Sequence, residues 1–289
     1  MICSACPRHC NIDRTVTQGF CRSPEIFRVA RASLHYWEEP CISGKKGSGT
    51  VFFSGCNLRC AFCQNYEISR ENKGVEVSEK RLIEIFESLI EQGANNINLV
   101  NPSHYSYQIA NLLSKWNSPV PIVYNTSSYE ELDAVRALDG LVDIYLPDLK
   151  YIRADKAQRY SQAQDYFEKA SAAVLEMRRQ VNDLFNDDGI MQKGVIVRHL
   201  ILPQNTNSSI EILKWIKDNL PDTYISLMAQ YTPCGDLTGL NEINRRITKR
   251  EYDKVVNYAL LNGFDKLFLQ ELSSATKNFI PKFDFTGIM

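Results

Sequence analysis

GTVFFSGCNLRCAFCQNYEIS, residues 49–69, is the stretch of the chain that decides both its fold and its chemistry. A β-branched and aromatic run at residues 50–53 predicts a buried strand that ends in a glycine turn at Gly55. Three cysteines follow this turn: Cys56, Cys60 and Cys63. The sequence therefore predicts a strand that delivers three thiols to one loop.

The spacing C-x-x-x-C-x-x-C supplies three metal ligands, whereas a structural zinc site or an ordinary four-cysteine cluster needs four. Three thiolates on a cubane [4Fe-4S] cluster leave one iron with open coordination, so that a cofactor can bind it through nitrogen and oxygen. The alternatives are a zinc loop that borrows a distant cysteine, and buried thiols that bind nothing.

At these residues the sequence resembles the radical S-adenosylmethionine (SAM) superfamily, whose shared motif has this spacing. Phe62 before the third cysteine and Gln64-Asn65 after it resemble the branch related to pyruvate formate-lyase activating enzyme. Within that branch, FFSGCNLRCAFCQN is most similar to uncharacterised homologues of the activase. The resemblance implies that Cys56, Cys60 and Cys63 hold a catalytic [4Fe-4S] cluster, with SAM on its open iron.

The resemblance also implies a reaction. One electron from an external flavodoxin- or ferredoxin-type reductant cleaves SAM, and the resulting 5′-deoxyadenosyl radical abstracts a hydrogen atom from the substrate. That substrate is expected to be a glycyl radical enzyme, another peptide or a small molecule. Two alternatives remain at this point: radical modification of an amino acid or peptide, such as epimerisation, and a non-catalytic iron-sulfur or zinc protein for electron transfer or scaffolding.

Composition narrows the class of protein. The 289 residues suffice for one α/β barrel of about 250 residues with a small extension. The chain has 33 Lys and Arg against 34 Asp and Glu, which gives no electrostatic footprint for nucleic acid or an anionic membrane. No apolar run approaches a membrane span, and the N-terminus lacks the apolar core of a signal peptide. We therefore expect a cytoplasmic protein with reduced thiols.

The first 21 residues contain a second group of cysteines, spaced two, three and ten residues apart: Cys3, Cys6, Cys10 and Cys21. Four cysteines in nineteen residues, with Pro7 and Gly19 between them, predict a closed four-thiolate metal site. Zinc and a second [4Fe-4S] cluster both suit four thiolates, and free thiols in a flexible tail are the alternative.

Beyond residue 70 the chain alternates between apolar runs and amphipathic segments. Ser78 and Gly93 bound a predicted helix, and five further helices are expected at 104–115, 128–138, 155–185, 208–219 and 248–262. Buried strands are expected at 97–100, 121–126, 143–149, 195–202, 224–231 and 266–272. This repetition predicts an α/β protein with parallel β/α units, and the resemblance implies a partial (β/α)6 TIM-type barrel. The predicted organisation is an N-terminal cysteine-rich extension and connector at 1–48, the barrel at 49–275 and a tail at 276–289.

Active sites of parallel barrels gather at the C-terminal ends of the strands, so the residues after each strand are the site candidates. The resemblance implies SAM contacts at Asn101 and Ser103, which replace a Gly-Gly-Glu type sequence, and at Asn125 and Ser127, which replace Asp-Thr-Asn-Gly. Asn125 in place of an aspartate lowers the charge available to a monovalent cation.

Later strand ends supply the charged candidates. The resemblance implies an anionic anchor at Asp148 with Lys150 beside it. Gln230, at the end of a later strand, is a further candidate SAM-site residue by its position. Arg198 lies in an apolar strand, where a charge is costly unless it is paired, so SAM's carboxylate is its expected partner. The barrel mouth is expected to contain His35, His104, His199 and Tyr231. Cys41 is expected to be a buried thiol, and Cys234 a hydrogen-atom donor, a ligand or a thiol without a role.

Overall fold

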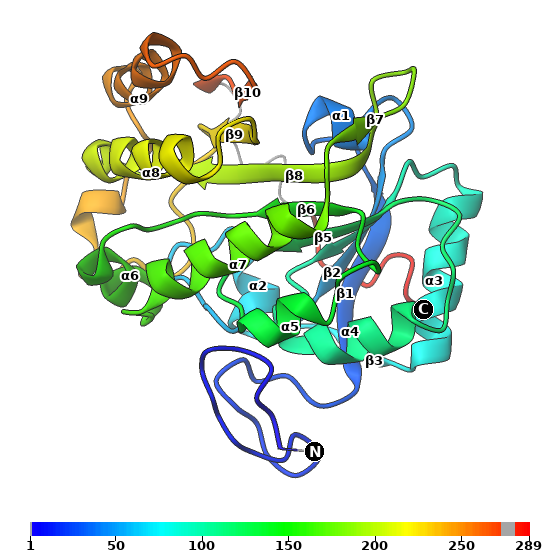
Figure 1. The fold of residues 1–289 in the computed structure, drawn as a ribbon. Helices are drawn as coiled ribbons and strands as arrows, with labels where there is room; N and C mark the ends of the chain where they lie inside the picture. Colours follow the sequence, from blue (N-terminus) through cyan, green and yellow to red (C-terminus); the bar gives the residue numbers. More distant parts are fainter. Residues whose placement is uncertain (1, 273–280) are drawn as a thin grey trace.

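The structure is a computed structural model that describes residues 2–272 and 281–289. Its centre is a curved sheet in the strand order β10-β9-β8-β6-β5-β4-β2-β1-β3, with β7 paired to β8 (Figure 1). Within the described residues, seven neighbouring strands run parallel: β2 (Ser48–Phe53), β4 (Ile97–Val100), β5 (Ile122–Thr126), β6 (Ile144–Pro147), β8 (Met191–Leu200), β9 (Tyr224–Met228) and β10 (Leu267–Leu269). The predicted parallel β/α fold is confirmed.

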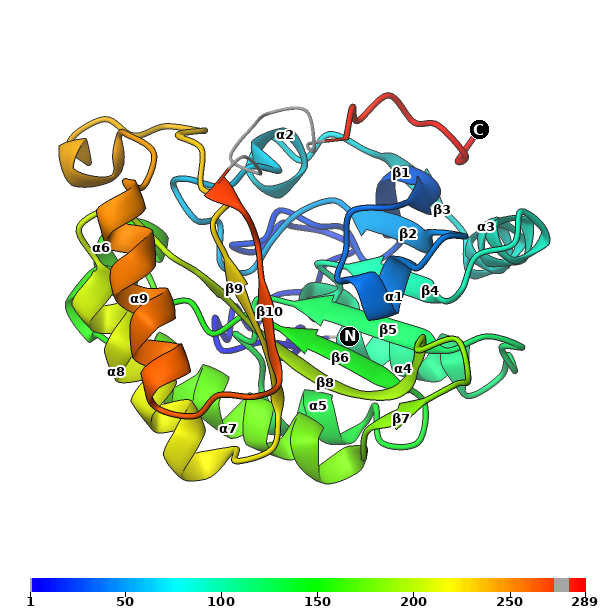
Figure 2. The same ribbon diagram turned by 90° about the horizontal axis from the view of Figure 1, so that it is seen from above.

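Helices connect these strands and cover the outer face of the sheet (Figures 1 and 2). They are α3 (Glu79–Glu91), α4 (Ser106–Leu113), α5 (Leu132–Arg136), α6 (Ala154–Ser161), α7 (Tyr166–Gln180), α8 (Thr206–Asn219) and α9 (Lys249–Leu261), with the short helices α1 (Pro40–Ser43), α2 (Tyr66–Ser69), η1 (Ser103–Tyr105) and η2 (Asn241–Ile243) in loops. The sheet does not close on itself, because β10 and β3 are its two ends. The result is compatible with a partial barrel.

Helix α3 shows why local sequence sufficed for much of this fold. The Ser78 hydroxyl accepts the backbone N–H of Arg81 at 3.1 Å, which caps the first turn. Its buried residues recur at helical spacing: Leu82, Ile85, Phe86 and Leu89. Gly93 follows with a φ of +89°, a left-handed conformation that ends the helix. Both predicted boundaries of this helix are confirmed.

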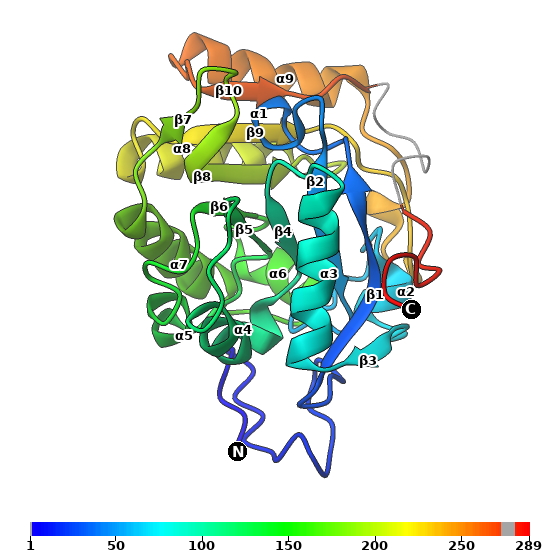
Figure 3. The ribbon, with the colours of Figure 1, turned by 90° about the vertical axis from the view of Figure 1, so that its right-hand side faces the viewer.

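Two antiparallel strands at one end of the sheet were not predicted. β1 (Phe27–His35) lies in the predicted connector and pairs antiparallel with β2 and with the short β3 (Val75–Val77), so β1 and β3 extend the sheet beyond β2 (Figure 3). Residues 281–289 also reach this edge, where the Thr286 carbonyl accepts the N–H of Ala32 at 2.9 Å. The predicted boundary between barrel and tail, at 275 and 276, lies outside the described residues.

The helix predicted at 155–185 is wrong as a single element. It divides into α6 and α7, with Gln162 at a left-handed φ of +51° between them. Its last residues form the two-residue strand β7 (Leu184–Phe185), which pairs with β8, and Leu184 is exposed there. The buried residues of α7 include Tyr166, Ala170, Val174 and Met177, which recur at helical spacing. No helix among the described residues is long and apolar enough to cross a bilayer.

Candidate active site

The three cysteines of the loop after β2 line the principal cavity of the described residues, which has a volume of about 510 Å³. Cys56, Cys60 and Cys63 come together there, as the sequence predicted. The amides of Leu58 and Arg59 both lie 3.4 Å from Cys56 Sγ and donate to it. Such N–H···S bonds stabilise a thiolate, which is the form of cysteine that binds metal.

Burial governs the acidity of these thiols. It raises the pKa of Cys56 to about 12 and that of Cys63 to about 11, and the neighbouring Cys60 adds to both shifts. A positively charged metal centre reverses this balance, because it takes the place of the protons on the sulfur atoms. Three thiols in one cavity, with backbone amides directed at one sulfur, therefore fit an iron-sulfur cluster that has three protein ligands.

An aromatic cluster fixes the position of the cysteine loop. The Phe62 ring meets Tyr151, Tyr160 and Tyr231 in edge contacts, with centroid separations of 6.5, 6.1 and 5.7 Å. Phe62 is buried, although it lies between two metal-ligand candidates. The aromatic residue before the third cysteine thus anchors the loop against the helices beyond β6 and the loop beyond β9.

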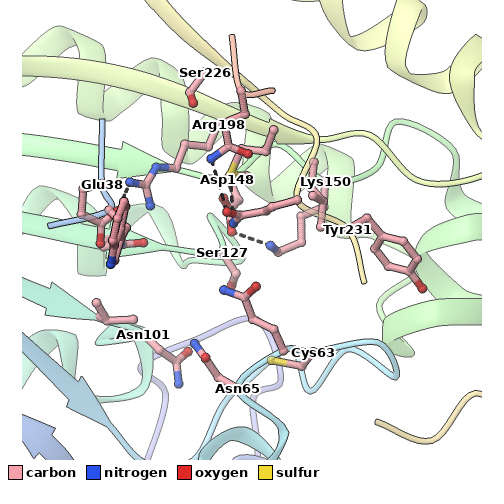
Figure 4. A pocket seen from close by; sticks show the side chains of 18 of the residues that line it. Glu38, Cys63, Asn65, Asn101, Ser127, Asp148, Lys150, Arg198, Ser226 and Tyr231 are labelled. Carbon is pink, nitrogen blue, oxygen red and sulfur yellow. Dashed lines mark hydrogen bonds and ion pairs between the residues drawn. The ribbon is translucent and has the colours of Figure 1, made fainter. Parts of the chain in front are cut away.

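The ends of β5 and β6 place polar groups opposite the cysteines. Figure 4 shows Ser127, Asp148 and Lys150 on the wall facing Cys63, with the Lys150 ammonium paired to the Asp148 carboxylate. The hydroxyl of buried Tyr166 joins the two strand ends: it donates to the carbonyl oxygens of Ser127 and Asp148 at 2.9 and 2.8 Å. It also accepts the Lys150 N–H at 2.9 Å, so Tyr166 positions both loops.

Arg198 projects from β8 into the same cavity, and its partners are protein carboxylates. Its Nε donates to Glu39 Oε1 at 2.9 Å and its Nη2 to Glu39 Oε2 at 2.5 Å, while Nη2 also pairs with Glu38 (Figure 4). The other Glu38 oxygen accepts from Asn98 at 3.0 Å. Burial opposes ionisation here, but the charges of Glu38 and Glu39 hold the pKa of Arg198 above its usual range. The predicted contact with SAM's carboxylate stays a prediction, because two carboxylates already occupy this guanidinium.

The other predicted site residues divide into two groups. Those that line the cavity are His35, Asn101, Asn125, Ser127, Asp148, Lys150, Gln230 and Tyr231. Ser103 lies outside this lining: it is fully buried, and its hydroxyl bonds to Thr126 Oγ1 at 3.0 Å. Its SAM contact therefore has no support from the cavity, and like the other SAM contacts it stays a prediction.

His104 and His199 are not at the barrel mouth, so that expectation was wrong. His199 follows Arg198 on β8, so the two side chains point to opposite faces of the sheet. His199 faces the helix layer, where its Nδ1 bonds the Leu149 carbonyl at 2.7 Å and its Nε2 bonds Ser209 Oγ at 2.8 Å. Burial lowers the pKa of His199 to about 4, and burial with the nearby Arg14 lowers that of His104 to about 3. Both rings are neutral structural groups at physiological pH.

Three carboxyl groups were not predicted: two in the cavity wall and a buried one behind β5. Glu38 and Glu39 are not among the predicted site residues, although the adjacent acidic pair directly before Pro40 is a visible signal. Glu130 is a buried carboxyl behind β5, and burial raises its pKa to about 7. Its position after a run of serines and a tyrosine gave no indication of burial.

Comparison with known proteins identifies the family. The radical SAM superfamily model matches residues 50–216, which include the cysteine loop and the strands up to β8. The chain belongs to the radical SAM superfamily. Radical SAM enzymes bind a [4Fe-4S] cluster and SAM and draw an electron from an external reductant, and the cysteine cavity of this chain suits that cofactor set. The activase branch suggested by the sequence is not established by this match.

Several relatives share the sequence or the fold. The uncharacterised protein MJ0674 of Methanocaldococcus jannaschii is 29% identical over 276 residues, which cover 92% of this chain and 76% of that protein. Streptococcus suis SuiB, solved with its precursor peptide SuiA, has a TM-score of 0.54 at 14% identity over 76% of this chain and 48% of SuiB. Methylornithine synthase (PylB) has a TM-score of 0.50 at 14% identity over 74% of this chain and 60% of PylB. The chain thus spans half to three fifths of these two structures, which show the shared fold alone.

Proposed function

We propose that this radical SAM enzyme abstracts a hydrogen atom from a residue within a polypeptide, in the manner of an enzyme that activates a glycyl radical enzyme. The [4Fe-4S] cluster and SAM, when bound, supply a 5′-deoxyadenosyl radical for this step. The residues of the chain hold the two cofactors, exclude water and present the substrate. Cys56, Cys60 and Cys63 are the proposed cluster ligands.

The rim of the cavity is the observation that supports a polypeptide substrate. The lining includes Tyr36 and Trp37, which follow β1 and whose residue exposures are 51% and 62%. It also includes Leu269, which is 43% exposed at the end of β10, so the cavity extends toward both edges of the open sheet. Exposed apolar side chains along the rim of a binding cavity are typical of a surface that another chain covers.

The charged groups of the cavity wall orient the bound cofactor. Arg198 carries one positive charge against two carboxylates, while Lys150 is matched by Asp148, so this wall has a net negative charge. A negative wall favours cationic groups, such as the sulfonium and ammonium groups of SAM. We propose SAM contacts from Asn101, Asn125, Ser127, Asp148, Lys150 and Gln230, all of which line the cavity.

A second candidate function is radical modification of the peptide itself, such as epimerisation. The loop after β9 contains Cys234, and its Gly235 packs so closely on the cysteine loop that a Cβ there would meet the Ala61 carbonyl at 2.3 Å. A thiol in this loop is therefore next to the cluster-binding residues, where it can return a hydrogen atom to a substrate radical. The two candidates share the abstraction step and differ in whether the substrate radical is kept or reduced.

The first experiment tests SAM cleavage. The chain is reconstituted anaerobically with iron and sulfide and mixed with SAM and dithionite, and 5′-deoxyadenosine is measured by mass spectrometry. The parent and the Cys41→Ala control are expected to form it, because Cys41 is buried outside the cysteine loop. Cys63→Ala is expected to form none. Equal cleavage by Cys63→Ala would contradict the proposed ligand set.

The second experiment tests the substrate class. Proteins extracted from source cells grown on α-deuterated glycine serve as the substrate pool, and deuterium is measured in the 5′-deoxyadenosine. Its appearance, with a protein radical detected by electron paramagnetic resonance (EPR), supports glycyl radical formation. Deuterium taken up from heavy water into a peptide, and lost in Cys234→Ser, would support epimerisation instead. Absence of deuterium in the 5′-deoxyadenosine would contradict glycyl radical formation, and absence of deuterium uptake from heavy water into any peptide would contradict epimerisation.

A further inference from the structure

The N-terminal cysteines lie in a segment with defined backbone structure. The Cys3 N–H donates to the Ile12 carbonyl at 2.8 Å, which closes a loop around the cysteines between them. His9, Asn11 and Arg22 have left-handed φ angles of +41°, +49° and +59°. Non-glycine residues persist in such conformations only when their surroundings fix them. This segment is therefore a folded cap, not a flexible tail.

All four thiols of this cap line one small cavity, together with Arg8, Arg14, Gly19 and His104: they are Cys3, Cys6, Cys10 and Cys21. A Cβ at Gly19 would lie 2.9 Å from Cys10 Sγ, so glycine is the residue that leaves room beside this sulfur. The Phe20 amide donates to Cys10 Sγ at 3.3 Å, as the Leu58 and Arg59 amides do to Cys56. The two cysteine groups thus share the N–H···S pattern of metal-binding thiolates.

Two buried polar groups at this cavity lack the partner that their chemistry requires. Arg14 is 7% exposed and donates to the carbonyl oxygens of Ser23, Pro24 and His104, but no carboxylate of the described residues pairs with its charge. His104 Nε2 bonds the Ser54 carbonyl at 2.8 Å, which leaves the Nδ1 lone pair buried without a partner. A cluster with four thiolate ligands supplies the negative charge that the buried Arg14 guanidinium lacks.

We infer that Cys3, Cys6, Cys10 and Cys21 bind a second [4Fe-4S] cluster. A tetrahedral zinc site with bonds of about 2.3 Å requires its sulfur atoms within about 4 Å of one another. Nowhere in the described part of the chain do three His, Cys, Asp or Glu side chains converge in a way that could hold a single metal ion. Cys56, Cys60 and Cys63 also do not form a single-ion site, and the radical SAM family places a four-iron cluster there. The four N-terminal thiols likewise line one cavity without forming a single-ion site, which favours the same kind of centre.

The second site is in direct contact with the first. A Cβ at Gly55 would lie 2.7 Å from the Cys21 carbonyl oxygen, and bond lengths then place the Cα atoms of Cys21 and Cys56 within about 10 Å of each other. Arg59 donates to the Phe20 carbonyl at 3.3 Å, and Arg8 to the Asn57 carbonyl at 2.8 Å. The N-terminal centre therefore fixes the loop that carries the SAM-cluster ligands, and its own ligands lie beside them.

Iron content tests this inference on the full chain, without any requirement for SAM cleavage. After anaerobic reconstitution, the parent and Cys41→Ser are expected to hold about eight irons per chain. The triple variant Cys56→Ser/Cys60→Ser/Cys63→Ser and the double variant Cys6→Ser/Cys21→Ser are each expected to hold about four. About four irons in the parent and none in the triple variant would overturn the inference. One tightly held zinc with about four irons in the parent would also overturn it, in favour of a zinc site.

A measurement on the parent alone covers the case in which a variant does not fold. The dithionite-reduced chain is expected to give two overlapping EPR signals, broadened by magnetic coupling because the two centres are adjacent. SAM is expected to shift only one of them, since four thiolates leave no iron open at the second centre. A single signal that SAM converts completely would overturn the inference. Loss of SAM cleavage with two signals retained would instead count against the proposed function alone.

Discussion

Glu130 is a buried carboxyl whose charge state controls part of the protein's stability. Thr126 Oγ1 donates to its Oε1 at 2.5 Å and the Tyr124 hydroxyl donates at 3.3 Å, while Oε2 is buried without a partner. No cation among the described residues forms an ion pair with it. Burial raises its pKa to about 7, against the opposing effect of these hydrogen bonds. The replacement Glu130→Gln keeps the shape and removes the titration.

The sign of the pH dependence follows from the raised pKa. The protonated carboxyl is the form that the fold favours, so its stabilising contribution is complete below the unfolded-state pKa and is lost as the pH rises through the folded-state value. With pKa values near 4.5 unfolded and 7 folded, the contribution falls by about 2 kcal/mol between about pH 5.5 and about pH 7.5. Glutamine at this position contributes no such change.

The assay is anaerobic urea denaturation of the parent and Glu130→Gln across this pH range. The informative quantity is the difference in unfolding free energy between the two proteins. Buried His104 and His199 have lowered pKa values, so both proteins lose stability as the pH falls, and the difference removes that common term. Glu87→Gln, on the exposed face of α3, is the matched control and should stay within about 0.5 kcal/mol of the parent.

The prediction is specific in direction. The free-energy advantage of the parent over Glu130→Gln should shrink as the pH rises from about 5.5 to about 7.5. A difference that is constant would show that Glu130 does not titrate in this range. A difference that grows with pH would show that Glu130 is ionised in the folded protein, and that a cation balances it. Either result would refute the assignment of a neutral buried carboxyl.

Two further stability predictions follow from single contacts. Glu39→Gln leaves the buried Arg198 charge with Glu38 as its only carboxylate, and we expect a loss of about 3 kcal/mol in urea unfolding, with recovery in Glu38→Gln/Glu39→Gln/Arg198→Met. No loss from the single change would show that the triad is not a buried ion pair. Ser78→Ala removes the cap of α3 and should cost about 1 kcal/mol, whereas Ser78→Asp should restore it. Equal stability of all three proteins would exclude a capping role.

The elements that the sequence predicted well are those with local determinants. α3 has a cap, a helical period and a terminal glycine within one segment, and the parallel strands are short apolar runs between helices. β1 was missed because Arg28 and Arg31 interrupt its apolar pattern, while its partner β2 lies further along the chain. Its pairing is a tertiary property that periodicity does not reveal.

The break between α6 and α7 has a tertiary cause as well. Residues 154–180 contain the alanine, glutamate, glutamine and arginine that favour one continuous helix. In the structure the Arg8 guanidinium caps the end of α6, where Nη2 donates to the Ser161 carbonyl at 2.8 Å and Nη1 bonds that of Gln162. Arg8, which lies 153 positions upstream of Ser161, thus stabilises the turn, and local helix propensity does not reveal this contact.

The candidate site divides in the same way. The sequence spacing alone predicts that Cys56, Cys60 and Cys63 lie together, because loop residues close in sequence are close in space. Arg198 was recognised as a buried charge that needs an anion, but the sequence could not say which anion. The anions present are Glu38 and Glu39, about 160 residues away, and no pattern in the chain links the two segments.

Gly55, the glycine directly before Cys56, has two roles, because it contacts both cysteine groups. Its φ of +84° makes the turn from β2 into the cysteine loop, which glycine adopts without strain. A side chain there would also meet Ser23 Oγ at 1.9 Å and the Cys21 carbonyl at 2.7 Å. The N-terminal cap therefore lies against the backbone immediately before Cys56. Because Gly55 forms the turn into the cysteine loop and also packs against the N-terminal cap, the two cysteine groups form one structural unit.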